Sequence, residues 1–158
     1  MSQSIPEPQF DELYRELILD HYRNPRRHEP LDEADVVAEG YNPLCGDEVE
    51  LRLRFEDGAV SDLSCSGRGC SISQASASML TDAVIGKTAA EARRLIEMFQ
   101  RMLIEPDAEV PAELGDLEAF QGVARFPVRV KCATLAWHTL EDGFKQREAG
   151  GHLARHEE

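Results

Sequence analysis

The chain has 158 residues, of which 42% are hydrophobic and 30% charged, and its formal net charge is −13 at pH 7. That length is enough to bury a core, and because contacts with phosphate need a basic face, the charge argues against nucleic acid or an anionic membrane as partner. The N-terminal stretch "MSQSIPEPQF" lacks the basic and apolar regions of a signal peptide, and no apolar run could span a bilayer. We therefore expect a cytoplasmic protein.

The N-terminal part of the chain predicts one amphipathic helix. In "FDELYRELILDHY", residues 10–22, apolar side chains recur at helical spacing. Asn24-Pro25 ends this helix, because the residue before a proline disfavours helical backbone. Residues 26–35 are polar and predict a loop.

A small antiparallel sheet is predicted next. Residues 36–41 are a possible first strand, and residues 49–55 alternate between apolar and polar side chains, as a half-buried strand does. The Asp57-Gly58 pair is a strong signal for a hairpin turn. Residues 60–65 then form the returning strand.

The second half of the sequence is predicted to be mainly helical. A helix rich in small side chains covers residues 70–86, and a Thr-Ala-Ala-Glu capping box opens a second helix over residues 88–103. The acidic residues 104–125 are expected to form a surface excursion with one helical turn. The last helix is expected from near 128 to 147. Together these elements predict an α+β fold, with a small antiparallel β-sheet of about three strands packed against several α-helices.

Three of the four cysteines lie where a metal ligand or a nucleophile would be useful. Cys45 lies on a Gly/Pro-rich loop one residue from Asp47, and a thiolate and a carboxylate pointing at one another would repel unless a cation lay between them. Cys70 begins a helix after two glycines, where the helix dipole and free N–H groups favour a thiolate. Cys132 falls in the first turns of the last helix and follows Arg129 and Lys131, whose positive charge also favours a thiolate.

Three thiolates and one carboxylate make a four-ligand set, which Zn²⁺ binds tetrahedrally. Iron held by thiolates is the other candidate. Because there is no CxxC pair and free cysteines are often buried as small apolar residues, core packing is the alternative interpretation. A reducing compartment argues against disulfides.

The remaining cysteine and the histidines favour structural interpretations. Cys65 follows Leu63 by two residues at the end of an alternating strand, so we expect a thiol that faces the core. His21 and His138 lie on predicted helices and are expected to be packed or surface residues. The histidines of the C-terminal tail have i,i+4 spacing, but we do not expect the tail to order them.

Four segments of the chain resemble the SufU/IscU family of iron–sulfur cluster assembly proteins. They are "LYRELILDHYRNPR", "NPLCGD", "SGRGCSISQASAS" and "RVKCATLAW", and the resemblance spans about residues 8–147. The middle two are the specific ones, a CGD loop and then a glycine-flanked cysteine that opens a Ser/Ala-rich helix. The length of the chain and the lack of internal repeats predict a single domain over residues 1–158, and the sequence "EAGGHLARHEE" predicts a flexible tail over residues 148–158.

Three features are similar to the SufU branch of the family rather than to its scaffold branch. Lys131 stands immediately before the last cysteine, where the scaffold branch has a histidine. The segment "RFPVRVKC" has a single proline where that branch has a Leu-Pro-Pro-Val-Lys segment. An acidic insertion at about residues 104–122 also lengthens the stretch before the last cysteine. SufU-branch members resemble zinc-dependent sulfurtransferases that accept persulfide sulfur from a SufS-type cysteine desulfurase.

The resemblance implies a site and a set of partners. It makes Cys45, Asp47, Cys70 and Cys132 the Zn²⁺ ligands, with Cys45 also the sulfur acceptor and Arg129 a residue near the site that steadies the released thiolate. The partners it implies are the desulfurase, which carries its own PLP, and a downstream iron–sulfur scaffold or other sulfur acceptor.

Two other functions remain open from the sequence. The same four residues could hold a [2Fe–2S] cluster under assembly, although Lys131 counts against that scaffold function. Alternatively, the zinc is structural and the protein is a non-catalytic activator of the desulfurase. An aspartate ligand on a loop favours a working site over a structural one, because structural zinc sites are usually closed and bound by cysteine and histidine alone.

Overall fold

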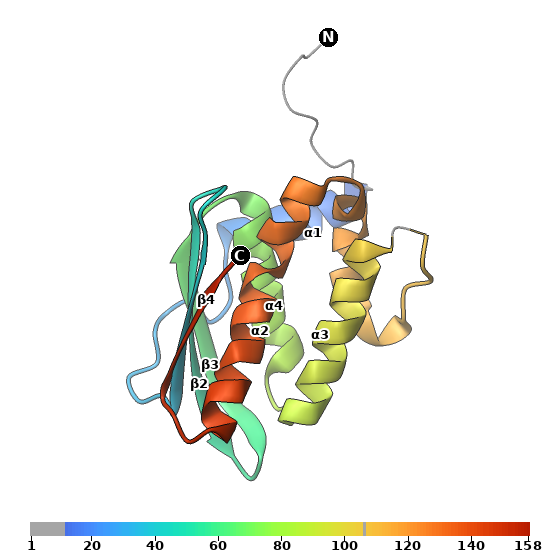
Figure 1. Cartoon of the computed structure of the whole chain (residues 1–158). Coiled ribbons are helices and arrows are strands. Elements are labelled where there is room, and N and C mark those ends of the chain that lie inside the picture. Colours follow the sequence, from blue (N-terminus) through green and yellow to red (C-terminus); the bar gives the residue numbers. More distant parts are fainter. Residues whose placement is uncertain (1–11, 106) are drawn as a thin grey trace.

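The computed structural model describes residues 12–105 and 107–158, and it has an α+β architecture of a sheet with helices gathered on one of its faces (Figure 1). The helices are α1 (Glu12–Arg23), α2 (Ser71–Val84), α3 (Ala89–Ile104), the 3₁₀ segment η1 (Ala112–Arg125) and α4 (Pro127–Glu148). The strands are β1 (Val36–Asn42), β2 (Asp47–Glu56), β3 (Ala59–Arg68) and β4 (Leu153–Glu157). Within the described ranges, no helix is long and apolar enough to cross a membrane. The first two residues of the predicted N-terminal helix lie outside those ranges.

The α+β prediction is confirmed, but the sheet has four strands in the order β3-β2-β1-β4 rather than about three. The central pairs are antiparallel, as expected, whereas β4 pairs in parallel with β1, for example Ala154 opposite Ala38. This strand lies in the segment expected to be a flexible tail. The expectation of a flexible tail was wrong. The edge of β1 presents unpaired backbone N–H and C=O groups, and a short segment can pair with them through backbone hydrogen bonds without an alternating apolar pattern.

Strand β2 carries a carboxylate into the interior. Its alternation puts Val49, Leu51 and Leu53 on the buried face, and Asp47 has the same parity at the start of the strand. The Asp47 side chain is 0% exposed. An acidic residue at that depth needs hydrogen-bonding or ionic partners, which makes this end of the sheet chemically unusual.

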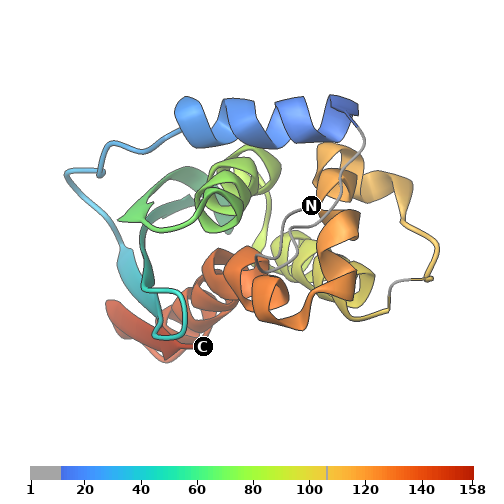
Figure 2. The same cartoon turned by 90° about the horizontal axis from the view of Figure 1, so that it is seen from above.

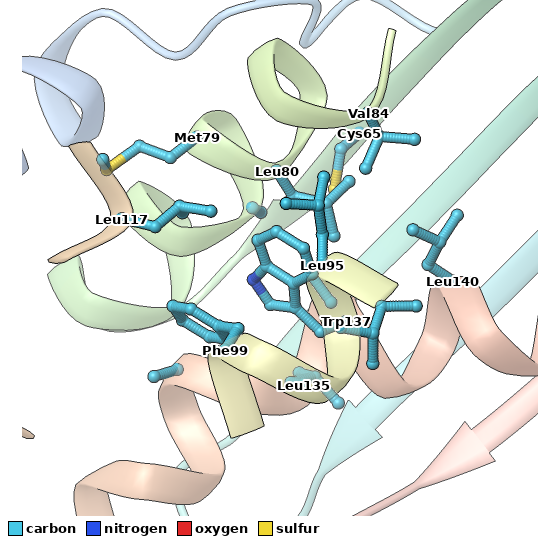
Figure 3. Close-up of a cluster of buried hydrophobic side chains, with 14 of the residues drawn as sticks. Cys65, Met79, Leu80, Val84, Leu95, Phe99, Leu117, Leu135, Trp137 and Leu140 are labelled. Atoms are coloured by element: carbon cyan, nitrogen blue, oxygen red, sulfur yellow. The ribbon is translucent and has the colours of Figure 1, made fainter. Parts of the chain in front are cut away.

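The main core lies between the sheet and α4, and α2 and α3 flank it. Trp137 of α4 stacks on Phe99 of α3 with ring centroids 4.7 Å apart (Figure 3). The indole Nε1–H of Trp137 donates to Ser76 Oγ of α2 at 3.0 Å, and that hydroxyl donates to the Ala133 carbonyl at 2.6 Å. Figure 2 shows α1 crossing over α2, which it contacts, on the outer side.

The acidic segment before α4 is more ordered than the expected excursion with one helical turn. A kink at Gly115, with φ +53° and ψ −127°, divides the segment η1 into two helical pieces. Leu114 is buried before the kink, and Leu117, Phe120 and Val123 are buried after it at a spacing of three residues. Residues three apart eclipse one another on a 3₁₀ helix, so the three after the kink form one apolar edge. That edge packs on α3, with the Phe120 ring edge-on to Phe99 at 5.8 Å between centroids.

Ser76→Ala should destabilise the fold by about 1–3 kcal/mol, because the buried indole N–H of Trp137 would lose its acceptor. Chemical denaturation would measure the change. Ser71→Ala, which is the same substitution at the start of the same helix, is the control and should change stability little. Equal stability of the two variants would show that the hydrogen bond between Trp137 and Ser76 does not contribute to the free energy of unfolding.

Candidate metal centre

The loop between β1 and β2 holds Cys45 at its tip. Asn42 is fully buried at the end of β1, and its backbone carbonyl accepts hydrogen bonds from the N–H groups of Cys45 (3.3 Å) and Gly46 (2.8 Å). Its side-chain Oδ1 accepts a third from the Leu44 N–H at 3.2 Å. Gly46 adopts a φ of +69°, which favours glycine, and the chain then enters β2. Cys45 is thus half-buried on a short turn rather than fixed within a helix or strand.

Asp47 ties the start of β2 to the start of α2. Its Oδ1 accepts a hydrogen bond from the Cys70 backbone N–H at 2.9 Å, and its Oδ2 lies 3.9 Å from Cys70 Sγ. Gly69 makes this approach possible, because a Cβ on that residue would lie 2.2 Å from Asp47 Oδ1. Its φ of +151° is also within the range that favours glycine. The carboxylate therefore fits only beside a residue without a side chain.

Cys132 completes the group from α4. Its Sγ lies 3.4 Å from Cys45 Sγ and is hydrogen-bonded to the Cys70 side chain. Cys45, Asp47 and Cys132 each offer a ligand atom within 4.8 Å of the other two, and Cys70 adjoins both Asp47 and Cys132. The structure thus brings the four predicted ligands together from the β1–β2 loop, β2, the start of α2 and the second turn of α4.

The predicted fifth site residue, Arg129, lies next to this group. It lines a groove of about 390 Å³ together with Cys45 and the residues that surround the start of α4. The other lining residues are Leu44, Arg125, Phe126, Pro127 and Val128. Of these, Leu44 is 68% and Val128 61% exposed, so the groove presents an apolar rim around one thiol.

Cys65 lies away from the group, as the strand pattern predicts. Its side chain is buried in the core near Leu80 and Val84 (Figure 3). Burial raises the pKa of the Cys65 thiol to about 12. At neutral pH this thiol is protonated and therefore a poor ligand and nucleophile.

The thiols of Cys70 and Cys132 interact through a hydrogen bond that shifts their pKa values in opposite directions. The hydrogen bond from Cys132 lowers the pKa of Cys70 to about 7, against the opposing effect of burial, and the Ser73 N–H adds to the lowering through its 3.4 Å contact with Cys70 Sγ. The pKa of Cys132 is raised, first because it donates to the Cys70 thiolate and then because it is buried. A divalent ion removes this competition, since it can bind both sulfurs as thiolates.

The donor set fits a thiophilic divalent metal. The donor atoms come from four separate segments: those of Cys45, Asp47 and Cys132 lie within 4.8 Å of one another, and Cys70, a thiol of lowered pKa, adjoins Asp47 and Cys132. Two adjacent anions at this depth are unfavourable without a compensating cation. Zn²⁺ accepts such a tetrahedral S₃O set, and thiolate-bound iron is the alternative.

Sequence reasoning missed two residues that shape this site, Asn42 and Gly69. Asn42 closes the loop that holds Cys45, and Gly69 leaves the space that Asp47 fills. The signal for Asn42 was its position as a turn former immediately before Pro43. For Gly69 there was only the residue type, since the sequence does not reveal which side chain comes close to it.

Comparison with known proteins identifies relatives along most of the chain. The model of the family described as "NifU-like N terminal domain" matches residues 13–144. The zinc-dependent sulfurtransferase SufU of Bacillus subtilis is 44% identical over 141 residues, which are 89% of this chain and 95% of SufU. The iron–sulfur cluster assembly scaffold protein IscU of Streptococcus pyogenes is 40% identical over 91% of this chain and 90% of its own.

A solved structure has the same fold. The crystal structure of the N-terminal part of a nitrogen-fixing NifU-like protein from Brucella abortus superimposes with a TM-score of 0.80 at 32% sequence identity. The superposition covers 88% of this chain and 96% of the Brucella chain.

Gly69→Ala should weaken metal retention, because the new methyl group would push the Asp47 carboxylate out of its position. Competition with a chelator, read as zinc released per chain, measures the effect. Gly58→Ala is the matched control: its φ is +79°, but a Cβ there would meet nothing within 4 Å. Gly58→Ala therefore introduces the strain of a positive φ but no steric clash. Equal zinc retention by the two variants would show that Asp47 is not needed to hold the metal.

Thiol alkylation of the metal-free protein should distinguish the cysteines. Labelling of Cys70 should rise with a midpoint near pH 7, whereas Cys65 should stay unlabelled until the protein unfolds. Mass spectrometry of peptides after a pH series gives both profiles. Labelling of native Cys65 at neutral pH would contradict its placement in the core.

Proposed function

The chain belongs to the NifU-like N-terminal domain family, and from this membership we propose that it serves iron–sulfur cluster assembly as a zinc-dependent acceptor and carrier of persulfide sulfur. The sulfur donor is a cysteine desulfurase of the SufS type, and both proteins act in the cytoplasm. The observation that carries the proposal is the position of Cys45, a half-buried thiol on a loop tip that adjoins both the ligand group and an open groove.

Cys45, Asp47, Cys70 and Cys132 are the proposed metal ligands. Bound Zn²⁺ would keep the thiols deprotonated at neutral pH without any redox chemistry of its own. Asp47 is held by the Cys70 N–H, and the cysteines at 70 and 132 are anchored on helices. These three residues can retain the ion while the loop that carries Cys45 moves.

The proposed transfer is a thiol–persulfide exchange. The Cys45 thiolate attacks the outer sulfur of a persulfide on the desulfurase, a new S–S bond forms at Cys45, and the S–S bond at the donor breaks. The donor cysteine leaves as a thiolate, so no external oxidant or reductant is needed. Arg129 lies along the same groove, where its positive charge would favour the free Cys45 thiolate during the exchange.

The groove beside Cys45 suits the approach of a partner protein. Leu44 and Val128 are exposed apolar residues on its rim, and Phe126 and Pro127 extend the apolar lining. Apolar side chains exposed together around a reactive group are typical of an interaction site. We propose that the desulfurase docks here and brings its persulfide to Cys45.

Two other functions are weaker fits. In a scaffold the same ligands would hold a [2Fe–2S] cluster, but Lys131 provides no imidazole beside the last cysteine. In a non-catalytic activator the metal would only stabilise the fold. In that case nothing would require one ligand to lie on a loop beside an open groove.

Cys45→Ala should abolish sulfur acceptance even in molecules that retain zinc, because Cys65 is buried and the other two thiols are held by helices. The assay incubates zinc-loaded protein with desulfurase and cysteine and measures persulfide on peptides by mass spectrometry, together with desulfurase turnover. Cys65→Ala is the matched control and should accept sulfur as the wild type does. Wild-type turnover with Cys45→Ala would favour the activator instead.

A further inference from the structure

A second group of metal-ligating side chains lies where β4 packs on α4. His138 of α4, His156 of β4 and Glu158 each offer a ligand atom within 4.8 Å of the other two. Glu158 Oε1 contacts His138 Nδ1 and lies 3.2 Å from His156 Nε2. The Glu158 side chain is only 8% exposed, and the two imidazoles are partly buried.

Asp142 organises this group from the next turn of α4. Its Oδ2 lies 2.8 Å from His156 Nδ1. A carboxylate that accepts the N–H of one ring nitrogen fixes the tautomer of the imidazole and leaves the other nitrogen as a lone pair. The Asp142–His156 pair therefore has the arrangement of a metal-binding histidine with its supporting carboxylate.

The contact between His156 and Glu158 is unfavourable in that tautomer. With Nδ1–H donated to Asp142, the lone pair of His156 Nε2 faces the Glu158 carboxylate oxygen at 3.2 Å. Two acceptors at this distance repel unless His156 takes a second proton or a cation lies between them.

Metal binding at this group needs Glu158 as a carboxylate and an unprotonated nitrogen on each imidazole.

We propose that His138, His156 and Glu158 form a second metal site, separate from the cysteine centre, that binds a divalent transition ion such as Zn²⁺ with Asp142 as the supporting residue. Two imidazoles and one carboxylate are ligands that Zn²⁺ and neighbouring first-row ions accept. His138 lies six residues beyond Cys132, about 9 Å along the helix and on a different side of it. A bound ion would hold β4 against α4, and β4 in turn covers the edge of β1.

The test is a titration of Co²⁺ into the untagged, full-length protein whose cysteine centre already holds one equivalent of zinc. The wild type should bind one further equivalent of Co²⁺ without thiolate-to-cobalt charge-transfer absorption, because no sulfur takes part. Since Zn²⁺ generally binds more tightly than Co²⁺, the zinc at the thiolates should stay in place. The thiolate bands would reveal any exchange there.

Variants locate the second equivalent. His138→Gln and His156→Gln should abolish it, and Asp142→Asn should weaken it about 10- to 100-fold. His152→Gln is the matched control, because His152 precedes the same strand and its ring Nδ1 lies 3.2 Å from the Asp35 carbonyl rather than beside the group, and it should bind as the wild type does. Zinc at the cysteine centre should be unchanged in all four, which keeps this test independent of the proposed sulfur transfer.

Two results would overturn the site. If the zinc-loaded wild type takes up no further Co²⁺, the group is a hydrogen-bonded network and not a metal site. If the second equivalent persists in both His138→Gln and His156→Gln, the metal binds elsewhere. The Co²⁺ titration of the wild type uses no variant, so its result does not depend on whether a substitution displaces β4 from α4.

Discussion

The hydrogen bond from the Cys70 backbone N–H to the buried Asp47 carboxylate is the constraint on which the rest of the site depends. It joins the first residue of β2 to the first turn of α2, and it is possible only because Gly69 has no side chain. With these elements locked together, Cys70 faces Cys132 of α4 and the loop before β2 brings Cys45 alongside. An acidic residue buried beside a thiol of lowered pKa gathers acidic groups in the interior, where a bound cation would balance their charge.

The four proposed ligands differ in how firmly the fold holds them, and this difference is what would allow one proposed zinc-bound thiol to take part in transfer chemistry. Cys132 is buried on α4, a helix that packs across the sheet, and Cys70 caps α2. Cys45 lies outside any helix or strand, on a short turn hydrogen-bonded to Asn42, with its Sγ 3.4 Å from that of Cys132. Thiol exchange needs access as well as a thiolate, so the least constrained ligand beside the apolar groove is the one suited to meet a partner.

Much of this arrangement could be predicted from residue patterns, and the misses have physical reasons. Local patterns in the sequence predict the alternating strand β2, the capping box of α3 and the core position of Cys65. Local patterns also predict the loop, strand and helices that carry the cysteines. The 3₁₀ segment was missed because its apolar spacing of three matches neither an α-helix nor a strand. Strand β4 and the group around Glu158 depend on pairing with distant elements, for which "LARHE" gives no local signal.

The central claim is that three cysteine sulfurs and the Asp47 carboxylate hold one zinc ion. X-ray absorption at the zinc edge tests it directly, on protein loaded with one equivalent of zinc in the His138→Gln background so that only the cysteine centre contributes. The account predicts three sulfur neighbours at about 2.3 Å and one oxygen at about 2.0–2.2 Å. A shell of four sulfurs, which would require Cys65, or a shell with two sulfurs or fewer would contradict it.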